Sequence, residues 1–195
     1  MVVSLGALVV LSPAIIVLVA LVALTSPGPV VYTHWRVGLR GGLFPCLKFR
    51  SMYADADARL QEVLDTDPEA RRQWEADHKI QNDPRVTPLG RFIRKTNLDE
   101  LPQLLNVLWG HMSIVGPRPI VPEEARRFGH SLPTVLSVKP GMAGLWQIGG
   151  RNDVSYDERV AFEVAYASHR TLRRDVVICF KTARQMLRPG SNGAY

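Results

Sequence analysis

Residues 2–24 read VVSLGALVVLSPAIIVLVALVAL, a run without a single charged side chain. As one helix rising about 1.5 Å per residue it would be roughly 35 Å long, enough to cross a hydrocarbon core of ~30 Å. The sequence Ala23-Leu24-Thr25 is a poor cleavage site, which argues against a secretory signal peptide. A buried core helix would be unusually long for so apolar a composition. We therefore predict that this segment attaches the chain to a membrane.

Two membrane arrangements fit this segment. A straight transmembrane helix would leave the basic remainder of the chain on the cytoplasmic side. A re-entrant helix would instead break at Ser12-Pro13, because proline removes one backbone hydrogen bond. Two arms of about ten residues, ~15 Å each, reach only the middle of a bilayer and can return. The carbonyl group that loses this hydrogen bond needs another donor, and the Ser12 hydroxyl is the local candidate.

The composition favours anionic partners and a single domain. The 195 residues contain 24 Lys and Arg against 18 Asp and Glu, a formal charge of +6. Such an excess suits phosphate groups, nucleic acid or acidic lipid headgroups, and the length suits one domain with its own core. Cys46 and Cys179 lack C-x-x-C spacing, so they indicate neither a disulfide framework nor a zinc site, and a reducing compartment suits them.

Residues 26–82 predict a hairpin and a helical pair. Ser26-Pro27-Gly28-Pro29 ends the apolar run, and residues 30–52 alternate around a Gly-rich turn, with Lys48 on the second arm. Residues 54–80 are highly charged, and Asp67-Pro68 is an N-cap and first-turn pair that divides them into two helices.

The C-terminal half predicts a loop and a long helix. Residues 133–151 carry four glycines among apolar side chains and predict an irregular loop. The C-terminal helix is expected to break near Arg170. Its second part is basic and amphipathic, which suits either a membrane surface or a core contact with a solvated basic face.

Two adjacent acids and an isolated arginine stand out in residues 96–119, TNLDELPQLLNVLWGHMSIVGPRP. Pro102 is tolerated only in a first helical turn, so a helix beginning with Asp99 as N-cap and ending at Gly110 accounts for the pattern. In this structural interpretation Glu100 complements the helix dipole.

A chemical interpretation of the same residues is also open. Adjacent helical positions point about 100° apart, so the two acids can take different roles, one attacking and one holding a metal. A carboxylate with an ordinary pKa near ~4 is ionised at neutral pH and needs no general base. Arg91, Arg94 and Lys95 gather anions nearby. Arg118, held between two prolines, presents a planar fork suited to phosphate oxygens.

Several motifs in order carry a family resemblance: KFRSM, NDPRVTPLGRFIRKTNLDELPQL, MSIVGPRP, KPG and GLWQIGGR. Through them the chain resembles the bacterial sugar transferases, the monotopic polyprenyl-phosphate phosphoglycosyl transferases, over essentially its whole length. The resemblance implies transfer of a sugar 1-phosphate from a UDP-sugar to undecaprenyl phosphate, with release of UMP. It places this reaction in the bacterial inner membrane, as the first step of exopolysaccharide or O-antigen assembly.

The resemblance also implies residue roles. Asp99 would be the catalytic nucleophile that carries a covalent phosphosugar, and Glu100 would assist catalysis by binding Mg²⁺. The substrate phosphates would be bound by Lys48, Arg94, Arg118 and Arg151. Ser12-Pro13 would be the break of a re-entrant helix, which favours that arrangement over a straight span.

The expected fold is α+β and mainly helical, with a re-entrant membrane helix, a small β-hairpin and interfacial amphipathic helices around one active site. Residues 1–26 would form the membrane helix and residues 27–195 the catalytic domain on the cytoplasmic face. Inner-membrane lipids are expected partners, and so is a homodimer, since the family is often dimeric. The family usually has a short basic, Asp-containing stretch before the apolar helix, whereas this sequence starts at Met1-Val2.

Other functions are conceivable. An aspartyl-phosphate-type hydrolase of nucleotide sugars would use water in place of the lipid. A non-enzymatic basic membrane adaptor would bind acidic lipid or nucleic acid, but no recognisable nucleic-acid module is present, and we expect no nucleic-acid partner. The helical insert at residues 54–82 resembles branches that transfer hexose 1-phosphate, which weakly favours UDP-galactose or UDP-glucose. Sugar selectivity depends on a few pocket contacts that one sequence does not reveal.

Overall fold

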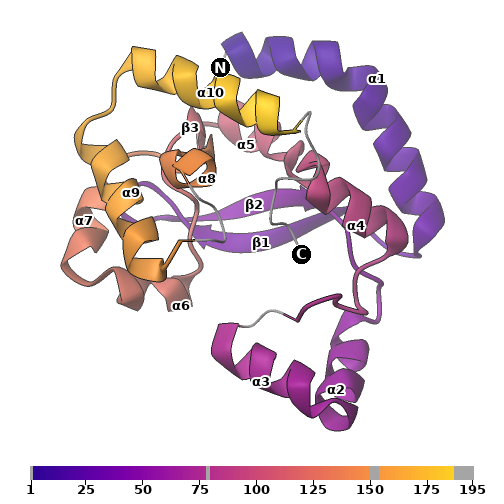
Figure 1. Ribbon diagram of the computed structural model, residues 1–195. Helices are drawn as coiled ribbons and strands as arrows, with labels where there is room; N and C mark the ends of the chain where they lie inside the picture. Colours follow the sequence, from indigo (N-terminus) through magenta and orange to yellow (C-terminus); the bar gives the residue numbers. More distant parts are fainter. Residues whose placement is uncertain (1, 78–79, 150–153, 187–195) are drawn as a thin grey trace.

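The computed structural model describes residues 2–77, 80–149 and 154–186. The described chain is mainly helical with two small two-stranded sheets, so the predicted mainly helical α+β class is confirmed. Helix α1 (Val2–Thr25) arches along one side, the hairpin crosses the middle, and α2 (Ala56–Thr66) and α3 (Pro68–Asp77) project from the opposite side (Figure 1).

Helix α1 is one uninterrupted helix with Pro13 inside it, and its ribbon bends along its length (Figure 1). Pro13 has no N–H to donate to the Val9 carbonyl four residues earlier. The Ser12 Oγ donates to that carbonyl oxygen at 2.8 Å instead. The predicted replacement donor is therefore confirmed, while the re-entrant arrangement in a membrane stays a prediction.

One face of α1 packs on the domain and the rest is exposed. Leu18 and Val22 are buried against Phe49, Ile93 and Leu104. Side chains from the first half of the helix also contact this core: Ala7, Leu8, Leu11 and Ile15. The exposed apolar side chains include Val2, Val3, Leu5, Val9, Val10, Ile16, Val17 and Leu24. The helix is long and apolar enough to cross a membrane, and its exposure excludes the alternative of a buried core helix.

The predicted hairpin is confirmed. Strands β1 (Val31–Val37) and β2 (Leu43–Phe49) pair antiparallel around η1 (Leu39–Gly41). Arg36 lies opposite Phe44, and Tyr32 lies opposite Lys48. Since opposite residues share a face and side chains alternate along a strand, Arg36 and Lys48 lie on one face of the hairpin.

One strand of a second sheet lies inside the segment predicted to be irregular, residues 133–151. Strand β4 (Gly141–Ala143) pairs in parallel with β3 (Ser113–Val115), and α7 (Leu132–Val135) and α8 (Leu145–Gly149) flank it. A Cβ atom on Gly141 would lie 2.0 Å from the Gly116 nitrogen. The loop prediction was wrong because this glycine permits close approach of two strands rather than marking a loop.

The helical predictions on either side are confirmed. Asp67 caps α3 through its Oδ1, which accepts from the backbone nitrogen of Glu69 at 2.8 Å and of Ala70 at 3.1 Å. The C-terminal helix is divided into α9 (Tyr156–Ser168) and α10 (Leu172–Met186). The remaining elements are α4 (Pro88–Lys95), η2 (Leu98–Glu100), α5 (Gln103–Leu108), α6 (Pro122–Ala125) and η3 (Arg126–Ser131).

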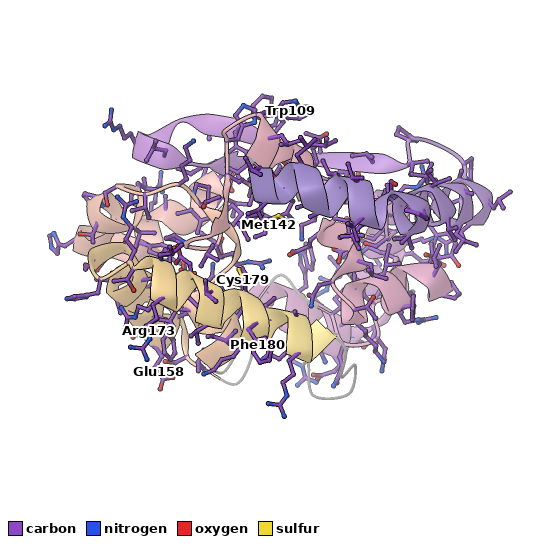
Figure 2. The ribbon with its side chains drawn as sticks, turned by 90° about the horizontal axis from the view of Figure 1, so that it is seen from above. Trp109, Met142, Glu158, Arg173, Cys179 and Phe180 are labelled. Carbon is purple, nitrogen blue, oxygen red and sulfur yellow. The ribbon has the colours of Figure 1, made fainter. Side chains whose placement is uncertain are left out.

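Helix α10 packs on the domain through buried Ile178 and turns other apolar side chains outward. Phe180 is 70% exposed, and Val176 is also exposed. Figures 1 and 2 place α10 and the first half of α1 on the same side of the molecule. Both helices also expose apolar side chains.

Candidate active site

The two adjacent acids lie on a 3₁₀ turn rather than at the start of an α-helix. Asn97 adopts a left-handed conformation with φ of 55°, and the Glu100 N–H donates to the Asn97 carbonyl at 3.2 Å. Helix α5 begins only at Gln103, with Pro102 before it. The prediction that Asp99 caps this helix was wrong. The carboxylate is thus not used for capping, which removes the purely structural explanation of the pair.

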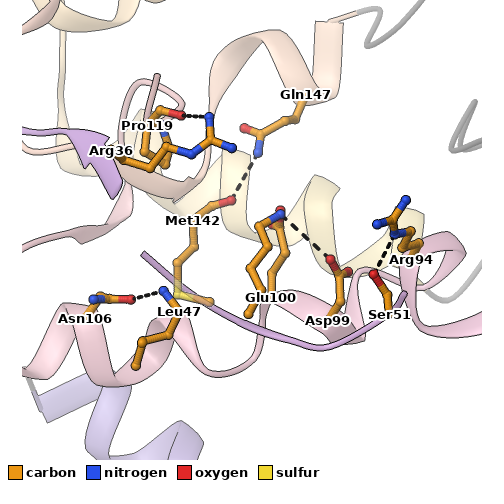
Figure 3. A network of polar contacts seen from close by, with 11 residues as sticks. Arg36, Leu47, Ser51, Arg94, Asp99, Glu100, Asn106, Pro119, Met142 and Gln147 are labelled. Atoms are coloured by element: carbon orange, nitrogen blue, oxygen red, sulfur yellow. Dashed lines mark hydrogen bonds and ion pairs between the residues drawn. The ribbon is translucent and has the colours of Figure 1, made fainter. Parts of the chain in front are cut away.

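Both acids face Lys48, which reaches them from β2. The Lys48 Nζ lies 2.7 Å from Glu100 Oε1 and 3.7 Å from Asp99 Oδ2 (Figure 3). Their side chains are 18% and 10% exposed respectively. An ion pair this poorly solvated is screened little by water, so the ammonium group stabilises negative charge on both carboxylates.

The two carboxyl groups differ in their proton affinity. Burial raises the pKa of Asp99, and the negative charge of Glu100 acts in the same direction against the charge of Lys48. Burial also opposes ionisation of Glu100, but Lys48 and Arg118 outweigh it and lower the pKa of Glu100. The expectation of an ordinary pKa for Asp99 is corrected. Its carboxylate is the more basic of the two and hence the better nucleophile once ionised.

The predicted phosphate-binding cations surround these acids. Arg94 donates from its Nε to Ser51 Oγ at 2.8 Å and lies next to Asp99 in Figure 3. Arg118 lies over the Trp146 ring at 5.7 Å, and its backbone N–H donates to Glu163 Oε1 at 3.1 Å.

The structure thus brings together five of the predicted site residues: Lys48, Arg94, Asp99, Glu100 and Arg118. Arg151 lies outside the described residues. Ser12 and Pro13 lie on α1, away from the pocket lining.

A pocket opens beside Glu100, lined by Arg36, Cys46, Lys48, Glu100, Gln103, Arg118, Pro119, Gly141, Met142 and Gln147. Of the described residues that line it, three are cations and one is an acid, Glu100, which is already paired with Lys48. Its excess positive charge suits an anionic ligand. Sequence reasoning missed Arg36, Gln103 and Gln147. The hairpin register could have revealed Arg36, because a turn at residues 38–42 places it on the same face as Lys48.

Asn106 fixes the distance between the hairpin and the acids. This fully buried side chain donates from Nδ2 to the Pro45 carbonyl at 2.7 Å and accepts from the Leu47 N–H at 3.0 Å. It thereby joins α5, which follows the acids, to β2, which carries Lys48. The ion pair is held by two hydrogen bonds that do not involve the reacting groups.

The two acids also bear on the expected Mg²⁺ site. Within the described ranges, no group of three or more His, Cys, Asp and Glu could hold a metal ion. Mg²⁺ commonly uses one or two carboxylates and completes its coordination with water and substrate phosphates. Glu100 Oε1 is bound to Lys48, which leaves its second oxygen. The residues fit a Mg²⁺ ion that substrate phosphates help to hold.

Comparison with known proteins gives consistent likenesses. The family described as Bacterial sugar transferase matches residues 1–189. A Salmonella typhimurium protein, undecaprenyl-phosphate galactose phosphotransferase, is 56% identical over 168 residues, covering 86% of this chain and 35% of that protein. The UDP-galactose-lipid carrier transferase of Erwinia amylovora is 48% identical over 192 residues, covering 98% of this chain and 40% of that protein.

A shorter relative is similar over most of its length. The exopolysaccharide production protein ExoY of Rhizobium meliloti is 48% identical over 176 residues, covering 90% of this chain and 78% of that protein. The chain therefore spans well under half of the two longer relatives and most of the shorter one.

Proposed function

The chain belongs to the bacterial sugar transferase family, and from this premise we propose that it transfers a sugar 1-phosphate from a UDP-sugar to undecaprenyl phosphate. The observation that carries the proposal is the pair of poorly exposed carboxylates around Lys48, next to a pocket that is otherwise cationic. Phosphoryl transfer depends on positioning and on positive charge around the phosphates, and this arrangement supplies both.

In the first step, an Asp99 carboxylate oxygen attacks the sugar-bearing phosphorus of the donor. The bond from that phosphorus to the bridging oxygen breaks, and UMP leaves with the electron pair. The phosphosugar stays on Asp99 as an acyl phosphate. The carboxylate needs no general base once it is ionised, and Lys48, Arg94 and Arg118 hold the charge of the phosphates.

In the second step, a phosphate oxygen of the lipid attacks the same phosphorus. The bond to the Asp99 oxygen breaks, the carboxylate is regenerated, and the lipid carries a diphosphate-linked sugar. The acceptor phosphate cannot leave its lipid tail, so the site must lie close to a membrane. Helices α1 and α10 support that placement, because they lie on one side of the molecule and both expose apolar side chains.

Mg²⁺ would supply further positive charge for the phosphates, and Glu100 is the residue that would hold it. We place the domain on the cytoplasmic face of the bacterial inner membrane, with residues 2–25 as a re-entrant helix. A galactose donor is our first candidate, because two relatives are named for galactose transfer. An exopolysaccharide or O-antigen pathway and a homodimer remain part of this proposal.

The test measures UMP release from UDP-galactose and UDP-glucose by the detergent-solubilised chain, with Mg²⁺ and with or without undecaprenyl phosphate. We expect release that depends on the lipid and is lost in Asp99→Asn, because the amide keeps the shape but not the attacking charge. Asp57→Asn is the matched control, since Asp57 is exposed on α2.

Three results would contradict the proposal in different ways. Release of UMP without undecaprenyl phosphate would indicate the alternative function, a hydrolase in which water replaces the lipid. Near-normal turnover in Asp99→Asn would remove its assigned role. Salt-sensitive binding of acidic vesicles without any turnover would favour the adaptor.

A further inference from the structure

Arg36 is a partly buried cation that makes no ion pair with the described residues. Its Nη1 donates to the Pro119 carbonyl at 3.5 Å, a long contact. Among the described residues no carboxylate lies within ion-pair distance of its guanidinium group. The group lines the pocket between the hairpin and the loop that carries Arg118.

Arg118 adds to this charge, while Glu124 and Glu100 oppose it from beyond ion-pair distance. Arg118 and Lys48 line the same pocket, and the pocket's one acid is already bonded to Lys48 at 2.7 Å. Burial lowers the pKa of Arg36, and the charge of Arg118 acts in the same direction. Holding like charges together in a partly buried pocket is unfavourable unless an anion joins them. The pocket therefore has the charge that suits a phosphate ligand.

Arg36 and Asp99 lie on different sides of Glu100. Figure 3 shows Arg36 on one side of Glu100, with Asp99 and Arg94 on the other. The charge contributions to the pKa values agree with this arrangement. The charge of Arg36 lowers the pKa of Glu100, and the charge of Arg94 lowers the pKa of Asp99. In an in-line displacement the leaving group departs opposite the nucleophile. A phosphate that leaves from a phosphorus bound near Asp99 would therefore move toward the Arg36 side.

We infer that Arg36 binds the nucleotide phosphate of the donor, the group that departs as UMP. This inference rests on the proposed function. When the bridging P–O bond breaks, the electron pair stays on the oxygen of that phosphate. The Arg36 guanidinium stabilises the charge that appears there through its planar donors. Arg118, which lines the same pocket, would add a second guanidinium for the same diphosphate.

The test compares binding of UMP and of uridine to the full chain in detergent by isothermal titration calorimetry. Loss of one charged hydrogen-bond partner is expected to weaken UMP binding by about tenfold to a hundredfold in Arg36→Gln. Uridine lacks the phosphate, so its affinity should not change. Arg40→Gln is the matched control, because the Arg40 side chain is exposed in the turn of the same hairpin.

Each outcome decides the role of Arg36. UMP affinity within twofold of wild type in Arg36→Gln would overturn it, and so would a wild type that binds no UMP. If Arg36→Gln loses its thermal unfolding transition, Arg36→Lys replaces it. That variant keeps the charge but lacks the planar fork, and it should still bind UMP several-fold more weakly than wild type. An unchanged affinity in Arg36→Lys would then refute the inference.

Turnover separates this inference from the proposed function. Lipid-dependent UMP release by the wild type, together with a lower kcat in Arg36→Gln, would support both. Binding of UMP that depends on Arg36, in a protein that never transfers the phosphosugar, would overturn the function and keep the nucleotide-phosphate site. Normal transfer by an Arg36→Gln variant with unchanged UMP affinity would keep the function and overturn the role of Arg36.

Discussion

Glu163 should make the stability of the chain depend on pH in a way that one isosteric substitution removes. Its side chain is 1% exposed on α9, and its Oε1 accepts the backbone N–H of Arg118 at 3.1 Å. Its Oε2 is buried and has no hydrogen-bond partner in the described part of the chain. Burial raises the pKa of Glu163 from 4.5 to about 7, against the opposing charges of Arg159 and Arg118. Protonation therefore favours the folded state.

The direction and size of the effect follow from these two pKa values. Between pH 4.5 and about 7 the folded chain binds more protons at Glu163 than the unfolded chain does. The free energy of unfolding should therefore fall as the pH rises through this window. A shift of this size corresponds to roughly 3 kcal/mol. Glu163→Gln stays neutral and keeps an oxygen for the Arg118 N–H, so it should lack this loss.

The assay is urea unfolding in detergent, followed by tryptophan fluorescence at pH 5, 6, 7 and 8. We expect the wild type and Glu163→Gln to have similar stability at pH 5. The variant should then become the more stable of the two by up to about 3 kcal/mol at pH 8. Glu123→Gln, an exposed acid on α6, should follow the wild type. If the difference in the free energy of unfolding between the wild type and Glu163→Gln does not change with pH, the reasoning is refuted.

Three further predictions concern the site itself. Because burial and the neighbouring Glu100 raise the pKa of Asp99, the rate of UMP release should fall on acidification at a higher pH than an ordinary aspartate would give. Glu100→Gln should move that acid limb of the pH–rate profile to lower pH, and an unmoved limb would contradict the coupling. Asn106→Asp loses its donor to the Pro45 carbonyl and buries a charge, so urea unfolding should show a loss of about 2–4 kcal/mol. Arg118→Lys should lower kcat at least about tenfold while keeping the charge, because the planar fork is lost, and a kcat within twofold of wild type would exclude a bidentate contact.

Local features of this fold could be predicted from the sequence. The capping role of Asp67, the hairpin turn and the Ser12 contact to the carbonyl freed by Pro13 all depend on residues within a few positions of one another. Features that depend on distant segments could not. The parallel pairing of Ser113 with Gly141 joins residues 28 positions apart, and strands of three residues carry no alternation that would reveal it.

The candidate site shows the same division. Asp99, Glu100 and Arg118 stand out as residue types in unusual surroundings, so their motifs could be found from the sequence alone. The prediction that Asp99 caps a helix failed because the left-handed Asn97 closes the preceding turn, and a 3₁₀ turn follows it. Arg36 has no unusual neighbours in sequence. Its importance appears only when the strand register places it on the same face as Lys48, in a pocket that Arg118 also lines.

The site residues come from separate segments, and buried polar contacts set the distances between them. Asn106 joins the helix after the acids to the strand that carries Lys48, and Glu163 holds the backbone of Arg118. Buried polar groups add little net stability, but they specify one arrangement when their hydrogen bonds are satisfied. Glu163→Gln preserves such a contact and should keep the site's geometry, whereas Asn106→Asp breaks one. If both variants had equal turnover per folded molecule, these contacts would serve folding alone and not the alignment of the reacting groups.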